Sequence, residues 1–136
     1  MKPRVFLDSG IFVAFLDRSD RWHAQARTLF ATPLRGWCTS LLVVAEAQAW
    51  FLHRLGEEPA RRFLALIADL QGLEILVPGA DHHREVVGTL DRLRGTRLTY
   101  VDASSLTLIG AHRIRRVWST DRHLGLTGAE VVPGGA

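Results

Sequence analysis

The chain has 136 residues, 47% of them hydrophobic and 23% charged, and these proportions fit one globular domain with a genuine core. The longest apolar stretch, residues 41–51, is interrupted by Glu46 and Gln48 and is too short to cross a bilayer, which argues against a membrane-spanning protein. Cys38 is the only cysteine, which excludes a disulfide framework and a cysteine zinc site. We therefore expect a single cytoplasmic domain over residues 1–136, with no signal peptide before its first strand.

The basic character of the chain comes almost wholly from arginine. The formal net charge is +3 and Lys2 is the only lysine, while the sequence pI is about 10.0. Eight arginines against four acids lie between Arg84 and Arg122. Arginine suits the recognition of phosphate groups, so a polyanionic partner is one interpretation. Codon bias in a GC-rich genome is the other, and the composition leaves both open.

The first predicted strand, residues 5–7, ends at an acid. Three large apolar residues without polar alternation indicate a strand that is buried on both faces. Asp8 follows it, and in open parallel α/β sheets ligands bind beyond the carboxyl ends of the strands. The alternative role of Asp8 is to cap a short helix over residues 11–16.

The rest of the chain alternates between predicted helices and strands. Further strands are expected at residues 36–38, 73–77 and 116–119, with a short edge strand at 131–132. Further helices are expected at about 20–30, 40–55, 59–70, 82–93 and 100–112. In the helix after Asp81, the apolar residues Val86, Val87, Leu90 and Leu93 are expected to face inward. This alternation predicts an α/β fold whose central sheet of four to five strands is mostly parallel and covered on both faces.

Glu46 lies within a predicted helix that is apolar nearly all round. It is past the first turn, so helix capping does not explain it. The nearest basic residues in sequence, His53 and Arg54, are about two turns away. Glu46 is therefore either at a solvated edge of the helix or a buried charge that needs a cation.

Two more acids have both a structural and a functional interpretation. Asp102 follows Thr99 in a pattern typical of a capping box, yet it opens an apolar helix close to the same rim of the sheet. Asp121 follows the strand at residues 116–119, where it can cap a turn. Jointly, Asp8, Glu46, Asp102 and Asp121 can converge on one rim, and such a cluster persists only with cations.

All-oxygen ligation by these four acids predicts Mg²⁺ or Mn²⁺ rather than zinc. The adjacent His82 and His83 are poorly arranged to share a metal, and we expect them on a solvated helix face. Hard cations in an arginine-rich domain favour phosphodiester hydrolysis by a metal-activated water. Ser9 and Thr120, each beside an acid, either orient waters or phosphate or cap helices.

In this order and spacing, five segments make the chain similar to PIN domains, specifically to the compact VapC-type toxins of prokaryotic toxin–antitoxin pairs. They are Phe6-Leu7-Asp8-Ser9, Trp22-His23 followed by Ala24 and Ala26, Ser40 to Glu46, Leu98 to Asp102, and Ser119 to Leu124. The resemblance runs over nearly the whole chain. It departs at Gly10, where many relatives carry Ser, Thr or Asn, and at Leu124, where an aromatic is common.

The resemblance implies a three-layer α/β/α sandwich and a catalytic, metal-binding set of Asp8, Glu46, Asp102 and Asp121. It implies a Mg²⁺-dependent endoribonuclease that leaves 5′-phosphate and 3′-hydroxyl ends. It also implies an RNA substrate, a homodimer and a small antitoxin that blocks the acid cluster. Two alternatives stay open: a PIN-like module that binds RNA or protein without cutting, and a nuclease that acts on DNA.

Overall fold

The computed structural model describes residues 4–32 and 36–134, which form one five-stranded sheet and its covering helices. The strands are β1 (Val5–Leu7), β2 (Trp37–Ser40), β3 (Glu74–Leu76), β4 (Arg116–Ser119) and β5 (Glu130–Pro133). The helices are α1 (Ser9–Leu16), α2 (His23–Ala31), α3 (Leu41–Leu55), α4 (Glu57–Asp69), α5 (His82–Arg92), α6 (Tyr100–Ala111) and the 3₁₀ helix η1 (Arg122–Gly125).

The sheet has the order β3-β2-β1-β4-β5, and every pair of neighbouring strands is parallel. β1 is central, with all three of its residues buried, as its unbroken apolar run predicts. Leu7 pairs with Trp118 of β4, and the Asp8 amide donates to the Trp118 carbonyl at 3.0 Å. The chain therefore leaves β1 and β4 at the same edge of the sheet.

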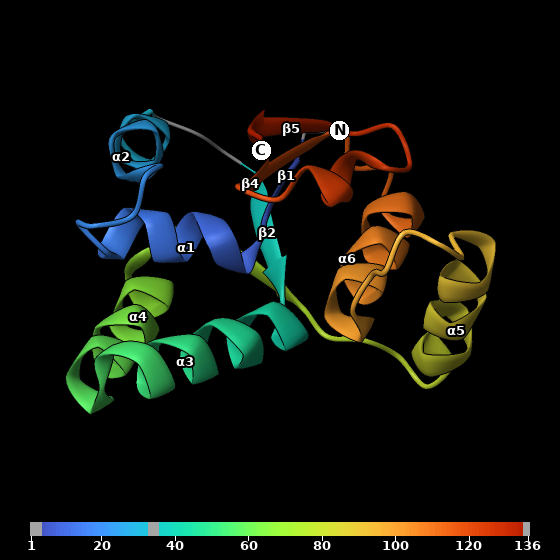
Figure 1. The fold of residues 1–136 in the computed structure, drawn as a ribbon, viewed down its shortest axis with the longest axis horizontal. Coiled ribbons are helices and arrows are strands. Elements are labelled where there is room, and N and C mark those ends of the chain that lie inside the picture. Colours follow the sequence, from blue (N-terminus) through green and yellow to red (C-terminus); the bar gives the residue numbers. More distant parts are fainter. Residues whose placement is uncertain (1–3, 33–35, 135–136) are drawn as a thin grey trace.

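Helices cover both faces of the sheet, as a three-layer α/β/α architecture requires. Helices α1 to α4 lie on one side, and α5 and α6 lie on the other (Figure 1). The core under the first group is aromatic: the Phe12 ring is edge-on to Phe63 at 5.3 Å, and Phe63 stacks on Phe51 at 5.4 Å. Because all three rings are fully buried, they hold α1, α3 and α4 together by packing.

Local signals set the limits of α3. The Ser40 hydroxyl accepts a hydrogen bond from the Val43 amide at 3.2 Å, so Ser40 is the N-cap. Gly56 ends α3 with a φ of 108°, a conformation that favours glycine. α4 then begins at Glu57, so Pro59 lies in its first turn.

Two expectations for α5 are wrong. His82 is buried rather than solvated, and its Nε2 lies 2.6 Å from the Ser104 hydroxyl of α6. Val87, expected to face inward, has 41% of its surface exposed. The cause is the position of α6, which covers the face that carries His82, Val86 and Thr89. His83 is exposed, as expected, and stacks against Tyr100.

No helix within the described ranges is both long and apolar enough to cross a membrane.

Candidate active site

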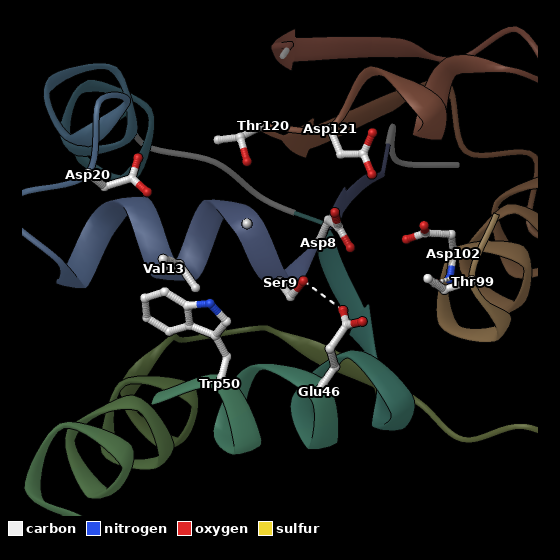
Figure 2. A pocket seen from close by; sticks show the side chains of 11 residues that line it. Asp8, Ser9, Val13, Asp20, Glu46, Trp50, Thr99, Asp102, Thr120 and Asp121 are labelled. Carbon is white, nitrogen blue, oxygen red and sulfur yellow. Dashed lines mark hydrogen bonds between the residues drawn. The ribbon is translucent and has the colours of Figure 1, made fainter. Parts of the chain in front are cut away.

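The four acids predicted from the sequence line a single pocket with a volume of about 430 Å³. Asp8 follows β1, Glu46 comes from α3, Asp102 from the first turn of α6, and Asp121 follows β4. Their carboxylates point into the same space from four separate elements (Figure 2). The pocket lies beyond the carboxyl ends of β1 and β4, where a parallel sheet places its ligands.

Asp8 is the most buried of the four. The Ser119 hydroxyl donates to its Oδ2 at 2.7 Å, whereas Oδ1 has no hydrogen-bond partner among the described residues. Burial raises the pKa of Asp8 to about 7, and the nearby Asp102 and Glu46 carboxylates add to this rise, while the Ser119 hydrogen bond opposes it. The side chain makes no capping bond to α1, so helix capping does not explain this residue.

Glu46 is half-buried and held by α1. The Ser9 hydroxyl donates to Glu46 Oε1 at 2.7 Å, a bond visible in Figure 2. Burial raises the pKa of Glu46, and the charges of Asp102 and Asp121 raise it further. Glu46 therefore lies between the two interpretations, a solvated helix edge and a buried charge. Its carboxylate is bonded to Ser9 and also points toward the other acids of the pocket.

Asp102 lies both in the expected capping pattern and in the pocket. Thr99 is the N-cap of α6, and its hydroxyl accepts a hydrogen bond from the Asp102 amide at 3.1 Å. Burial and the Asp121 charge raise the pKa of Asp102, while hydrogen bonds with Thr99 oppose the rise. The capping pattern and the pocket position are therefore compatible.

Asp121 also combines a local bond with a place in the pocket. Its Oδ1 accepts from the His123 amide at 2.9 Å and lies 2.8 Å from His123 Nδ1. The first of these bonds caps η1, as the turn interpretation predicts. The same side chain faces Asp8 across the pocket (Figure 2).

A fifth acid, Asp20, also lines this pocket, although nothing in the sequence marks it as a site residue. Its Oδ1 accepts from the Trp22 amide at 2.8 Å, which fixes the turn before α2. Trp50 of α3 lines the pocket as well. The sequence carries no signal for either position, because both depend on how α1, α2 and α3 pack against one another.

The donor set is an open group of carboxylates, the ligand type that hydrated divalent cations prefer, rather than a closed metal cage. Across residues 4–32 and 36–134, no three His, Cys, Asp or Glu side chains form a group positioned to hold an ion. The charges of neighbouring acids nevertheless add to the rise in the pKa values of Asp8, Glu46 and Asp102, so these carboxylates lie close enough to interact. Mg²⁺ keeps several of its waters and needs only one or two carboxylates directly. The unpartnered Oδ1 of Asp8 is a free ligand atom for such an ion.

A comparison with family models identifies a PIN domain over residues 5–129. No curated protein sequence matches the chain.

Several solved structures share the fold. VapC20 of Mycobacterium tuberculosis, described as a sarcin-ricin loop cleaving toxin, matches with a TM-score of 0.85 and 22% identity, over 92% of this chain and 95% of that one. VapBC2 from Rickettsia felis, bound to a DNA fragment from its promoter, matches with a TM-score of 0.68 and 16% identity, over 94% and 96%. A toxin–antitoxin complex from Klebsiella pneumoniae matches with a TM-score of 0.65 and 16% identity, over 94% and 95%. At these identities the likeness establishes an α/β fold shared with VapC toxins.

Proposed function

The chain belongs to the PIN domain family, and from this premise we propose that it is a metal-dependent endoribonuclease, the toxin of a VapBC-type toxin–antitoxin pair acting in the cytoplasm. The observation that carries the proposal is the pocket itself. Four carboxylates from four separate elements line it, and the buried Asp8 has an unpartnered oxygen there. Burying like charges together costs free energy, so the arrangement indicates a site built for a cation.

In the proposed reaction, Asp8, Glu46, Asp102 and Asp121 would hold Mg²⁺ or Mn²⁺, either directly or through the waters that the ion keeps. The bound ion would lower the pKa of a water and neutralise charge on the phosphate. Ser119 fixes the rotamer of Asp8 through its 2.7 Å bond, and Ser9 fixes Glu46 in the same way. These two hydroxyls therefore orient carboxylates. Hydrolysis by water leaves 5′-phosphate and 3′-hydroxyl ends in this proposal.

We also propose a cognate antitoxin and a homodimer as partners. One of the solved structures with this fold is described as a toxin–antitoxin complex, and another contains VapBC2 bound to a DNA fragment from its promoter. Large apolar side chains remain exposed on α3, which contributes Glu46 to the pocket, and on the neighbouring α4, and they supply surface for protein contacts: Leu41, Leu52 and Leu55 on α3, and Leu64 on α4.

The proposal is tested by cleavage of a stem-loop RNA, including the sarcin-ricin loop, with Mg²⁺, Mn²⁺ or EDTA. We expect cutting with either metal, none in EDTA, and a loss of at least about a hundredfold for Asp102→Asn, since that change removes a ligand charge. Asp69→Asn, an exposed acid at the end of α4, is the matched control and is expected to cut like the wild type.

Single-stranded DNA in the same assay distinguishes a ribonuclease from a nuclease that ignores the 2′-hydroxyl. RNA binding without metal-dependent cutting would contradict the proposal and favour the non-catalytic binding module.

A further inference from the structure

Thr120 brings to the pocket a hydroxyl that forms no hydrogen bond with the described residues around it. The Ser9 hydroxyl donates to Glu46 and the Ser119 hydroxyl donates to Asp8. For the Thr120 hydroxyl, no hydrogen-bond partner exists within the parts of the chain that the structure describes. Thr120 directly follows β4, and its oxygen points down toward α1 between Asp20 and Asp121 (Figure 2).

Gly10, in the first turn of α1, provides the space for this hydroxyl. A Cβ added to Gly10 would overlap Thr120 Oγ1, and the next nearest atoms also belong to Thr120. The backbone of Gly10 does not need glycine, since its φ lies outside the positive range that other residues avoid. Glycine inside a helix is less favourable than alanine. A larger residue at position 10 would therefore displace the Thr120 hydroxyl from its present position.

A neutral donor suits this pocket better than a charged one. Asp8, Asp20, Glu46, Asp102 and Asp121 all line it. An arginine or lysine here would pair with these carboxylates and compete with the cation that the proposed function requires. A hydroxyl can donate to a phosphate oxygen without neutralising any acid, so it adds recognition of the substrate at no cost to metal binding.

We infer that the Thr120 hydroxyl binds a non-bridging oxygen of the scissile phosphodiester, and that Gly10 is the positioning residue that allows it to do so. The inference rests on the proposed nuclease function and assigns the substrate contact within it. The inference also gives Thr120 and Ser9 different roles, although each follows or precedes an acid in the sequence. Ser9 orients Glu46, whereas Thr120 contacts the substrate.

The alternative is that Gly10 and Thr120 only let the end of β4 pack closely on α1. Thr120→Val keeps the shape of the side chain and removes the donor, while Thr120→Ser keeps the donor. Substrate binding predicts a loss of kcat/KM of about a hundredfold for Thr120→Val, the effect of removing one donor to a reacting oxyanion, and near-normal cleavage for Thr120→Ser. If only close packing matters, Thr120→Val should cleave better than Thr120→Ser, because valine retains the methyl contacts and serine loses them.

The role of Gly10 is tested by a double-mutant cycle. Gly10→Ala is expected to displace the Thr120 hydroxyl and lower kcat/KM, but to have no further effect in a Thr120→Ala background, since the overlap is then gone. Gly110→Ala on α6 is the matched control, because a Cβ there has nothing within 4 Å. Unfolding temperature and Mg²⁺ affinity are measured for every variant, and Thr120→Val is expected to change neither.

The outcomes separate the inference from the proposed function. Wild type that cuts no RNA contradicts both. Wild type that cuts RNA while Thr120→Val cuts equally well overturns the inference alone. Additive losses from Gly10→Ala and Thr120→Ala, accompanied by matching losses of stability, also overturn it. Loss in Thr120→Val with recovery in Thr120→Ser, at unchanged stability and Mg²⁺ affinity, supports it.

Discussion

The burial of Asp8 makes the stability of the metal-free protein depend on pH. Its pKa is about 7 in the folded protein against an ordinary value of 3.8. Between these values the folded state binds a proton that the unfolded state releases, so the free energy of unfolding falls as the pH rises from about 4 to about 7. Burial raises the pKa values of Glu46 and Asp102 as well, so both residues contribute in the same direction.

Asp8→Asn is therefore expected to stabilise the metal-free protein at alkaline pH. Asparagine removes the buried charge and can still accept the Ser119 hydrogen bond, so we expect a gain of about 1–3 kcal/mol at pH 8 that shrinks as the pH falls toward 4. Urea unfolding in EDTA at several pH values measures this difference. Asp69→Asn serves as the exposed control. A gain that is the same at pH 5 and pH 8 would contradict the role of the Asp8 charge.

At the scale of single residues, the sequence indicates four of the acids that line the pocket but not how they are held. Asp8 and Asp121 can be recognised because they follow apolar strands, and Glu46 because it interrupts an apolar helix. The Ser119 bond to Asp8 joins residues 111 positions apart. It depends on the pairing of β1 with β4, and no local pattern encodes that pairing. The same holds for the approach of Thr120 to Gly10, which only the packed structure brings together.

At the scale of elements, polar contacts join α5 to α6, the helix that carries Asp102. His82 Nε2 lies 2.6 Å from Ser104 Oγ, and Thr89 Oγ1 lies 2.8 Å from Thr107 Oγ1. Ser104 is fully buried and comes two residues after Asp102. The contact with α5 therefore helps to fix the start of α6, where it enters the pocket.

Ser104→Ala is expected to lower the free energy of unfolding by about 1–3 kcal/mol, because it leaves the buried His82 ring without its partner. Ser105→Ala is a close control, since the Ser105 hydroxyl is also buried but has no hydrogen-bond partner in the described structure. We expect that change to be neutral or stabilising. Urea unfolding at neutral pH measures both variants. Equal effects would show that the His82 contact contributes nothing beyond packing.

The order and type of the elements could be predicted because hydrophobic runs and capping residues are local. The predicted strand at 116–119 coincides with β4, and the edge strand at 131–132 lies within β5 (Glu130–Pro133). The inward face of α5 could not be predicted in the same way. Its apolar residues allow more than one face, and the position of α6 selects the one that buries His82 and exposes Val87.

At the scale of the whole molecule, eight of the sixteen arginines lie between Arg84 and Arg122. Their exposure is what a phosphate-binding surface requires. Arg97 and Arg122 are exposed and have no ion pair within residues 4–32 and 36–134. Each is close in sequence to a pocket residue, Thr99 and Asp121 respectively. Arg62 is equally exposed but belongs to α4, at the opposite end of the molecule from α5 (Figure 1).

This distribution predicts which arginines bind RNA. Each of Arg97→Gln and Arg122→Gln is expected to reduce the slope of log Kd against log salt by about 0.7, the value for one phosphate contact on a single strand. Arg62→Gln is expected to leave the slope unchanged, although it alters the net charge by the same amount. Fluorescence anisotropy with a labelled RNA in EDTA, which prevents cleavage, measures the slope between about 50 and 200 mM salt. Equal slopes for all three variants would mean that net charge alone attracts RNA, and codon bias would then explain the arginine content.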